Sequence, residues 1–250
     1  MNHYFSIEEF NEDLEISILD TEKVANERIS ANPSLNLNTE TIRINTDRGS
    51  IEVLLNRADN STQAVLLFGG ARGGPYAVLG PGDNVYQVIA ERLSNIGITV
   101  LRLHYREAGN FTESVLDVMG ACLYLTGIGI NRIVVVGHSF GGAVAIKIGQ
   151  LLPSVIAVAA LATQLYGTRQ VSEMYKPLLL IHGTQDEILY HTVSEDIFAR
   201  ANNPKKLVLI NGAGHRLEED AQRLFDELND FLVACIDGDL STFPEDRSKP

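Results

Sequence analysis

The chain of 250 residues has no tryptophan and almost no cysteine, since Cys122 and Cys235 are the two that it contains. Both lie in apolar patterns typical of helices, so we predict two buried free thiols rather than a disulfide framework, as in a reducing cytoplasm. Long apolar runs are also missing. No stretch approaches the roughly 20 apolar residues that a helix needs to cross a bilayer, so we expect no membrane span.

Positive charge is scarce, with 20 Lys and Arg against 32 Asp and Glu and a formal net charge of −12. Because an acidic chain repels phosphate backbones, and because no basic cluster interleaved with aromatic residues is present, we expect no nucleic-acid partner. Metal motifs of the H-E-x-x-H or C-x-x-C type are absent. His182, Asp186 and His191 lie near one another in the sequence but form no tight ligand group, so we expect neither a metal nor a cofactor.

The length suits one sizeable domain with one core. We divide the chain into an acidic N-terminal extension at 1–38, a body at 39–236 and a polar tail at 237–250. Ser6 and Glu9 resemble a capping box, so the extension is expected to contain helix. The extension could pack on the core or provide a surface for homo-oligomer formation. Because Met1–Leu14 lacks the basic and apolar pattern of a signal peptide, we predict a cytoplasmic location.

Alternation of apolar and polar residues at 41–47 and 50–56, with Asp47-Arg48-Gly49 between them, predicts an antiparallel hairpin at the edge of a sheet. Strands and helices then alternate, which predicts a mainly parallel, buried sheet covered on both faces, an α/β fold. The expected strands are 64–69, 98–104, 132–137, 155–160, 177–182 and 205–210. The expected helices are 83–96, 112–126, 140–151, 191–201 and 216–234, the last containing Glu218, Glu219 and Asp220.

The most informative stretch is Gly137-His138-Ser139-Phe140-Gly141, which reads G-x-S-x-G. It follows an apolar strand and precedes a small-residue helix, the context of a nucleophile elbow. In such a sharp turn the serine is strained, and side chains two residues to either side would collide with backbone. The alternative is a glycine-rich turn whose serine only caps the helix.

Two later strands end in loops that carry further candidate catalytic residues. His182-Gly183-Thr184-Gln185-Asp186 follows one strand, and Gly212-Ala213-Gly214-His215 follows the next. The order serine, aspartate, histidine, each after a strand, separates this scaffold from other serine-triad folds. Glu187 is the local rival of Asp186 as the acid, since no acidic residue lies between positions 153 and 172.

The motifs G-H-S-F-G-G, H-G-T-Q-D and G-A-G-H resemble the α/β-hydrolase superfamily over roughly residues 40–235. Within it the chain looks most like small, lid-poor serine esterases and dienelactone-hydrolase-like proteins, although dienelactone hydrolases typically carry cysteine where this chain has Ser139. The resemblance implies the α/β-hydrolase fold, with an antiparallel N-terminal hairpin. The short interval between the strands at 155–160 and 177–182 implies little or no cap domain.

These residues predict a serine hydrolase of the carboxylesterase or thioesterase type that acts on a small-molecule ester or thioester through an acyl-enzyme. Ser139 would be the nucleophile, His215 the general base, and Asp186 the residue that orients His215. The oxyanion hole would use the N–H of Phe140 and that of Gly70 or Ala71. This glycine-rich loop is not a P-loop, because Gly74 is followed by proline.

Other residues near this chemistry allow two readings each. Arg72 could bind a substrate carboxylate or be structural, and Leu79, Leu165 and Tyr166 could line an acyl pocket or pack locally. Tyr105-Arg106-Glu107-Ala108-Gly109 resembles the superfamily's Y-R-G-x-G stretch, with Glu107 in place of glycine, and the resemblance implies a structural role for Arg106. The alternative functions are peptide or amide hydrolysis, dienelactone-type ring opening, transfer to an acceptor other than water, and a non-catalytic binding protein on the same scaffold.

Overall fold

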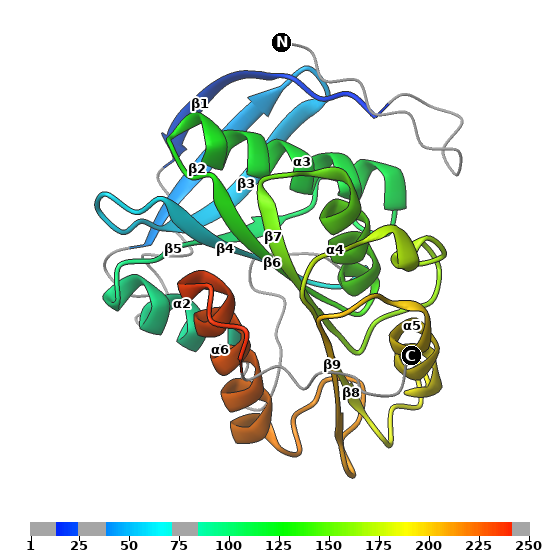
Figure 1. Ribbon diagram of the computed structural model, residues 1–250. Coiled ribbons are helices and arrows are strands. Elements are labelled where there is room, and N and C mark those ends of the chain that lie inside the picture. Colours follow the sequence, from blue (N-terminus) through cyan, green and yellow to red (C-terminus); the bar gives the residue numbers. More distant parts are fainter. Residues whose placement is uncertain (1–13, 25–38, 72–84, 242–250) are drawn as a thin grey trace.

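A computed structural model describes residues 14–24, 39–71 and 85–241 (Figure 1), so the expected capping box at Ser6 lies outside the described residues. Its centre is a nine-stranded sheet in the order β1-β2-β3-β5-β4-β6-β7-β8-β9. The strands are β1 (Ile18–Val24), β2 (Thr39–Thr46), β3 (Gly49–Asn56), β4 (Gln63–Phe68), β5 (Thr99–His104), β6 (Arg132–His138), β7 (Val155–Leu161), β8 (Leu178–Gly183) and β9 (Lys205–Ile210). The helices are α2 (Val85–Asn95), α3 (Phe111–Gly127), α4 (Phe140–Leu151), α5 (Thr192–Arg200) and α6 (Ala221–Asp237).

Strands β4 to β9 run parallel to one another, while β1, β2, β3 and β5 pair in antiparallel fashion. This confirms the predicted parallel sheet and the hairpin of β2 and β3. The hairpin is not at the edge, however, and that part of the prediction is wrong. The unpredicted strand β1 pairs with β2 and forms the edge instead.

Strand β1 is unusual because its sequence, Ile-Leu-Asp-Thr-Glu-Lys-Val, is rich in residues that strands disfavour. Its charges find partners across the register with β2. Glu22 lies opposite Arg43 and accepts a hydrogen bond of 2.8 Å from it, and Lys23 bonds Glu40 at 2.6 Å. Such cross-strand pairs each contribute roughly 0.2–1 kcal/mol to a sheet, so β1 is supported by its neighbour rather than by its own propensity.

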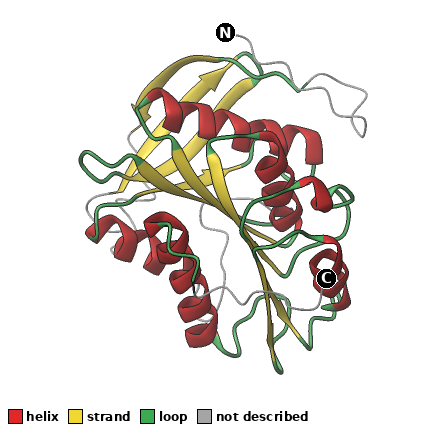
Figure 2. Ribbon diagram, in the orientation of Figure 1, coloured by secondary structure: helices red, strands yellow, loops and turns green. Residues whose placement is uncertain are grey.

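Helices lie on both faces of the sheet (Figure 2), and an apolar layer lies on each face. Because successive side chains of a strand point to opposite faces, β4 sends Leu66 and Phe68 to one layer and Val65 and Leu67 to the other. The first layer packs against α3, α4 and α5, and the second against α2 and α6. The predicted cover of helices on both faces is therefore confirmed.

The helices agree with the predicted ranges except at the start of α6. The sequence predicted a helix from residue 216, but α6 begins at Ala221. The preceding acids stabilise a loop: Asp220 is the N-cap and accepts a hydrogen bond from Arg223 N, and Glu219 accepts one of 3.0 Å from Gly214 N. These side chains therefore shape the loop that carries His215.

Arg106 has the structural role that was expected. It directs its guanidinium to the carboxylates of Asp117 and Glu113 on α3, with Nη2 2.8 Å from the Glu113 oxygen. Its backbone N–H also donates to Asp117 at 2.8 Å. Burial raises the pKa of Asp117, while the hydrogen bonds from Arg106 lower it, and the net shift is upward. The cluster joins the loop after β5 to helix α3.

Between β7 and β8 the chain makes a short connection with a single 3₁₀ turn at Val171–Glu173. This connection leaves no room for an inserted helical cap, as predicted. Cys122 and Cys235 are both free and buried, as expected, and burial raises the pKa of each thiol to about 12. Over the ranges that the structure describes, no helix has both the length and the apolar character that crossing a membrane requires.

Candidate active site

Ser139 stands at a strained turn between β6 and α4. Its φ of 59° and ψ of −122° lie in a region that non-glycine residues rarely adopt. Backbone hydrogen bonds hold the turn: Ser139 N donates to Leu161 O at 2.8 Å, and Ser139 O accepts from Gly142 N at 3.0 Å and from Gln164 N at 3.4 Å. The serine makes no side-chain capping bond to α4. The alternative in which it only caps the helix is therefore wrong.

The flanking glycines are sterically required, which confirms the argument from sequence. A Cβ atom at Gly137 would lie 2.0 Å from the carbonyl oxygen of Gly141. A Cβ atom at Gly141 would lie 2.3 Å from the carbonyl oxygen of Gly69. The turn can thus fold back on itself and press against the loop after β4 only without side chains at these two positions.

The three residues predicted to carry the chemistry form one hydrogen-bonded series. His215 Nε2 lies 3.0 Å from Ser139 Oγ, and His215 Nδ1 lies 2.7 Å from Asp186 Oδ2. The Asp186 carboxylate can only accept hydrogen bonds, so His215 Nδ1 carries a proton and donates a hydrogen bond to it. In the neutral ring Nε2 then has the lone pair and can accept the Ser139 hydroxyl proton.

Asp186 is held firmly on its other oxygen. Oδ1 accepts the backbone N–H groups of Ile188 at 2.9 Å and Leu189 at 2.8 Å. Burial tends to raise the pKa of Asp186, but hydrogen bonds from Leu189 N, His215 and Ile188 N outweigh it and lower the pKa below its usual value. Its rival Glu187 is exposed and makes no such contact in the described structure. Among the two acids, the geometry favours Asp186.

The loops that carry Asp186 and His215 are tied to each other. Gln185 N donates to Ala213 O at 2.9 Å, and Gly212 N donates to Thr184 Oγ1 at 2.9 Å. The first loop follows β8 and the second follows β9, which are neighbours in the sheet. The short distance between the acid and the histidine is therefore built into adjacent strand ends.

Two further histidines contact this series, and the sequence motifs gave neither of them a part in it. His138, inside the elbow, has Nε2 2.9 Å from the carbonyl oxygen of His215, and the two rings are 4.9 Å apart. Burial lowers the pKa of His138 to about 4. His182 has Nε2 3.1 Å from Asp186 Oδ2. The spacing His-Gly-x-x-Asp places His182 and Asp186 four residues apart, but it does not distinguish this contact from the packing of an ordinary core histidine.

Part of the predicted oxyanion hole lies beside the serine. Gly70 faces it so closely that a Cβ atom there would be 3.2 Å from Ser139 Cβ and 3.6 Å from Oγ. Phe140 is the first residue of α4, where helix N–H groups lack intrahelical partners. Ala71 is exposed and is the last residue of the described range 39–71. Arg72 and Leu79 lie outside the described residues.

A cavity of about 530 Å³ lies beside the elbow, lined by Phe111, Leu165 and Tyr166 together with residues of the following loop and of α5. Edge-to-face ring contacts connect this cavity to Phe140, the residue after Ser139. The Phe140 and Phe111 rings are 5.9 Å apart, and those of Phe111 and Tyr166 are 5.3 Å apart. Leu165 and Tyr166 are exposed, so they border an open space rather than packing in the core.

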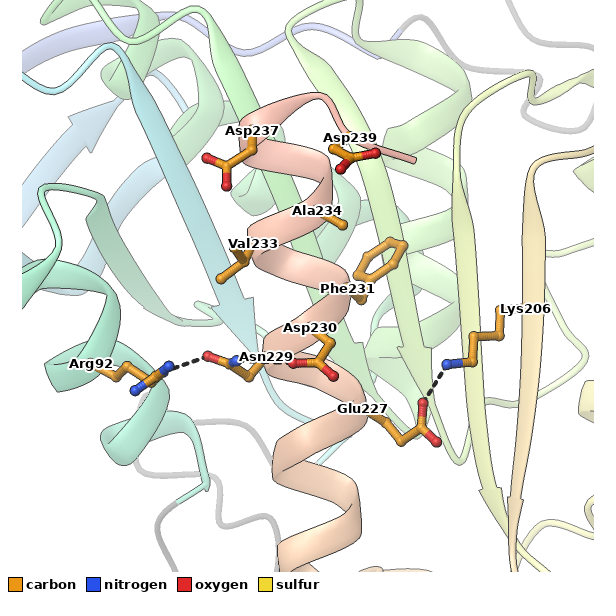
Figure 3. Close-up of a pocket in the computed structure, with 10 residues that line it drawn as sticks. All are labelled: Arg92, Lys206, Glu227, Asn229, Asp230, Phe231, Val233, Ala234, Asp237 and Asp239. Carbon is orange, nitrogen blue, oxygen red and sulfur yellow. Dashed lines mark hydrogen bonds and ion pairs between the residues drawn. The ribbon is translucent and has the colours of Figure 1, made fainter. Parts of the chain in front are cut away.

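A second cavity, of about 450 Å³, runs along α6 and shares no lining residue with the first (Figure 3). Lys206 and Glu227 form an ion pair of 2.5 Å there, and Arg92 donates to Asn229 at 2.7 Å. Because both of these cations already have partners, we assign this cavity no chemistry.

Comparison with solved structures defines the class of protein. Est1E from Butyrivibrio proteoclasticus matches with a TM-score of 0.67 at 17% identity, over 78% of this chain and 98% of its own. Dienelactone hydrolase from Anabaena variabilis matches with a TM-score of 0.68 at 19% identity, over 78% and 96%. An alpha-beta serine hydrolase homologue from Coxiella burnetii matches with a TM-score of 0.64 at 20% identity, over 77% and 97%. The chain thus has the α/β-hydrolase fold.

The family follows from the sequence comparison. Residues 85–230, more than half of the chain, match the family model described as platelet-activating factor acetylhydrolase, isoform II. The chain belongs to this family. It is also 27% identical over 178 residues to an uncharacterized protein of Mycobacterium tuberculosis (strain H37Rv), a match that takes in 58% of this chain and 63% of that protein. The match therefore spans less than two thirds of that relative's length.

Proposed function

We propose that this chain is a serine hydrolase that cleaves a carboxylic ester or thioester through an acyl-enzyme. The observation that carries the proposal is the series from Ser139 Oγ through His215 to Asp186, with the serine at a strained elbow. Membership of a family named for an acetylhydrolase supports it. Dienelactone-type or amide hydrolysis would use the same series on a different acyl group.

The geometry suggests how each residue acts. Ser139 Oγ attacks the acyl carbon while His215 Nε2 takes the hydroxyl proton. Asp186 stabilises the imidazolium through the Nδ1–H bond. The N–H of Phe140, with that of Gly70 or Ala71, holds the oxyanion, and one such donor contributes about 3 kcal/mol to the transition state in subtilisin. His215 then protonates the leaving group. In the second half of the reaction a water molecule, which gives a proton to His215, attacks the acyl-enzyme, and the carboxylic acid is released as the proton returns to Ser139.

We further propose a short acyl group, since the family is named for removal of an acetyl group from platelet-activating factor. The cavity bordered by Phe111, Leu165 and Tyr166 would take an apolar part of the substrate. Its rings reach the elbow through Phe140. Homo-oligomer formation, cytoplasmic location and the absence of a metal or cofactor stay predictions.

The test is labelling with a fluorophosphonate, followed by a nitrophenyl-ester chain-length series that includes the acetyl ester, and by platelet-activating factor itself. Ser139→Ala is the test variant, and Ser114→Ala, which removes the hydroxyl of a fully buried serine on α3, is the control. We expect labelling and acetyl-ester turnover in the wild type and control and neither in Ser139→Ala. Labelling without ester turnover would indicate another acyl group or acceptor. A folded wild type that does not label would indicate a binding protein.

A further inference from the structure

The Asp186 carboxylate is shared between two histidines. Its Oδ2 atom lies 2.7 Å from His215 Nδ1 and 3.1 Å from His182 Nε2. His182 lies near the end of β8 and is fully buried, and the aspartate follows it four residues later, in the turn after the strand. The carboxylate therefore has a second donor on the oxygen that faces the proposed general base.

The hydrogen-bond partners determine the tautomer of His182. Nε2 faces the Asp186 carboxylate and, at 2.8 Å, the carbonyl oxygen of Leu189. Both partners only accept hydrogen bonds, so Nε2 carries the proton. Nδ1 lies 2.7 Å from Oγ of Ser194, a fully buried residue of α5. In the neutral ring Nδ1 has the lone pair, so the Ser194 hydroxyl donates to it.

The surroundings of His182 favour the neutral ring. Burial lowers the pKa of His182 below its usual value, even though the Leu189 carbonyl and Asp186 favour the charged form. A neutral donor supports the carboxylate without placing a second cation beside the His215 imidazolium. The titratable groups that face His182 are Asp186 and His215. His138 packs beside His215.

We propose that His182, held by Ser194, is a positioning residue that acts through Asp186: its Nε2–H donates to Oδ2, the oxygen that His215 also uses, and so limits how strongly Asp186 binds the His215 ring. The series then runs from Ser194 on α5 to Ser139 on the elbow. The inference rests on the proposed function and deepens it, because it concerns how strongly Asp186 stabilises the protonated form of His215, the proposed general base.

Two donors on one oxygen weaken each other, since each disperses the negative charge that the other uses. Without the His182 bond, Asp186 would hold the His215 imidazolium more strongly. More of the His215 ring would stay protonated at a given pH, and the acid midpoint of the pH–rate profile would move to higher pH. The two backbone bonds to Oδ1 would remain, so the carboxylate would stay in place.

The experiment compares His182→Leu, which removes the donor, with His182→Gln, whose amide nitrogen can donate from a similar position. Ser194→Ala removes the hydroxyl that holds the ring, and Ser114→Ala is its matched control. Two readouts are used: the pH profile of the fluorophosphonate inactivation rate, and the downfield proton NMR resonance of His215 Nδ1–H. The second needs no turnover, so it tests the inference even if the wild type proves not to be a hydrolase.

We expect the acid midpoint in His182→Leu to rise by about half a pH unit or more, and its Nδ1–H resonance to move. His182→Gln should restore both toward the wild-type values, Ser194→Ala should shift them in the same direction by less, and Ser114→Ala should leave them unchanged. A folded His182→Leu with wild-type midpoint and resonance would overturn the proposal. If that variant does not fold, unchanged readouts in Ser194→Ala would overturn it instead.

Discussion

His138 should make the stability of this protein depend on pH in a defined window. Burial lowers its pKa from an ordinary value near 6.5 to about 4, and its Nε2–H donates to the His215 carbonyl. In the unfolded chain the same ring takes up a proton near pH 6.5. Between these two values the unfolded state binds a proton that the folded state does not, so the free energy of unfolding falls as the pH is lowered. Above this pH range neither state binds the proton, so the free energy of unfolding no longer changes with pH through His138.

The size of the effect follows from the shift. Each pH unit of difference corresponds to about 1.4 kcal/mol. A shift from about 6.5 to about 4 therefore removes up to about 3 kcal/mol from the free energy of unfolding by the time the pH reaches 4. Typical domains have only about 5–15 kcal/mol in total, so the loss is large enough to measure.

The assay is urea unfolding followed by far-UV circular dichroism at several pH values between about 7 and about 4. His138→Gln keeps an amide donor but cannot be protonated, so its stability should fall less steeply than that of the wild type. His104→Gln, which removes an exposed histidine at the end of β5, is the control and should follow the wild type. His182 is present in both proteins, so it contributes equally to their pH dependence, and only His138 can make the two curves differ. Parallel curves for the wild type and His138→Gln would therefore refute the reasoning.

Three further predictions concern close packing and buried charge. Gly141→Ala would place a Cβ atom 2.3 Å from a backbone oxygen, so we expect a loss of at least about 3 kcal/mol in urea unfolding. Gly70→Ala would place one 3.2 Å from Ser139 Cβ, so kcat/KM should fall by about 10-fold to 100-fold while the unfolding midpoint changes little; an unchanged kcat/KM would contradict the oxyanion assignment. Arg106→Leu would leave the buried Asp117 carboxylate without its cation and should destabilise the fold by about 3–5 kcal/mol, a loss that lower pH, by protonating that carboxylate, should partly reverse.

The sequence predicted most of the parallel part of the sheet because its strands are continuous apolar runs bounded by turns. It missed β1, whose charged residues are stable in a strand only through partners such as Arg43 and Glu40 on β2. Cross-strand pairs of this kind depend on the register, which periodicity within one segment cannot reveal. The same omission placed the hairpin of β2 and β3 at the edge.

For the site, the motifs predicted the three residues that the structure brings within hydrogen-bonding distance, and the strand ends explain why. What could not be predicted is the contact of His182 and of His138 with that series. The first depends on how the loop after β8 turns back on its own strand, and the second on where the loop after β9 lies relative to the end of β6. A histidine that packs in a core and one that holds a carboxylate give the same local pattern in the sequence.

The order of the strands also bears on how the protein behaves at high concentration. The outermost described strands, β1 and β9, present backbone groups with which another molecule could pair. Both carry charge at the surface: β1 has the exposed Asp20, Glu22 and Lys23, and β9 has the partly exposed Lys206, whereas Lys205 is buried. Charged residues on edge strands oppose strand addition between molecules. Neutralising these positions is therefore expected to reduce solubility.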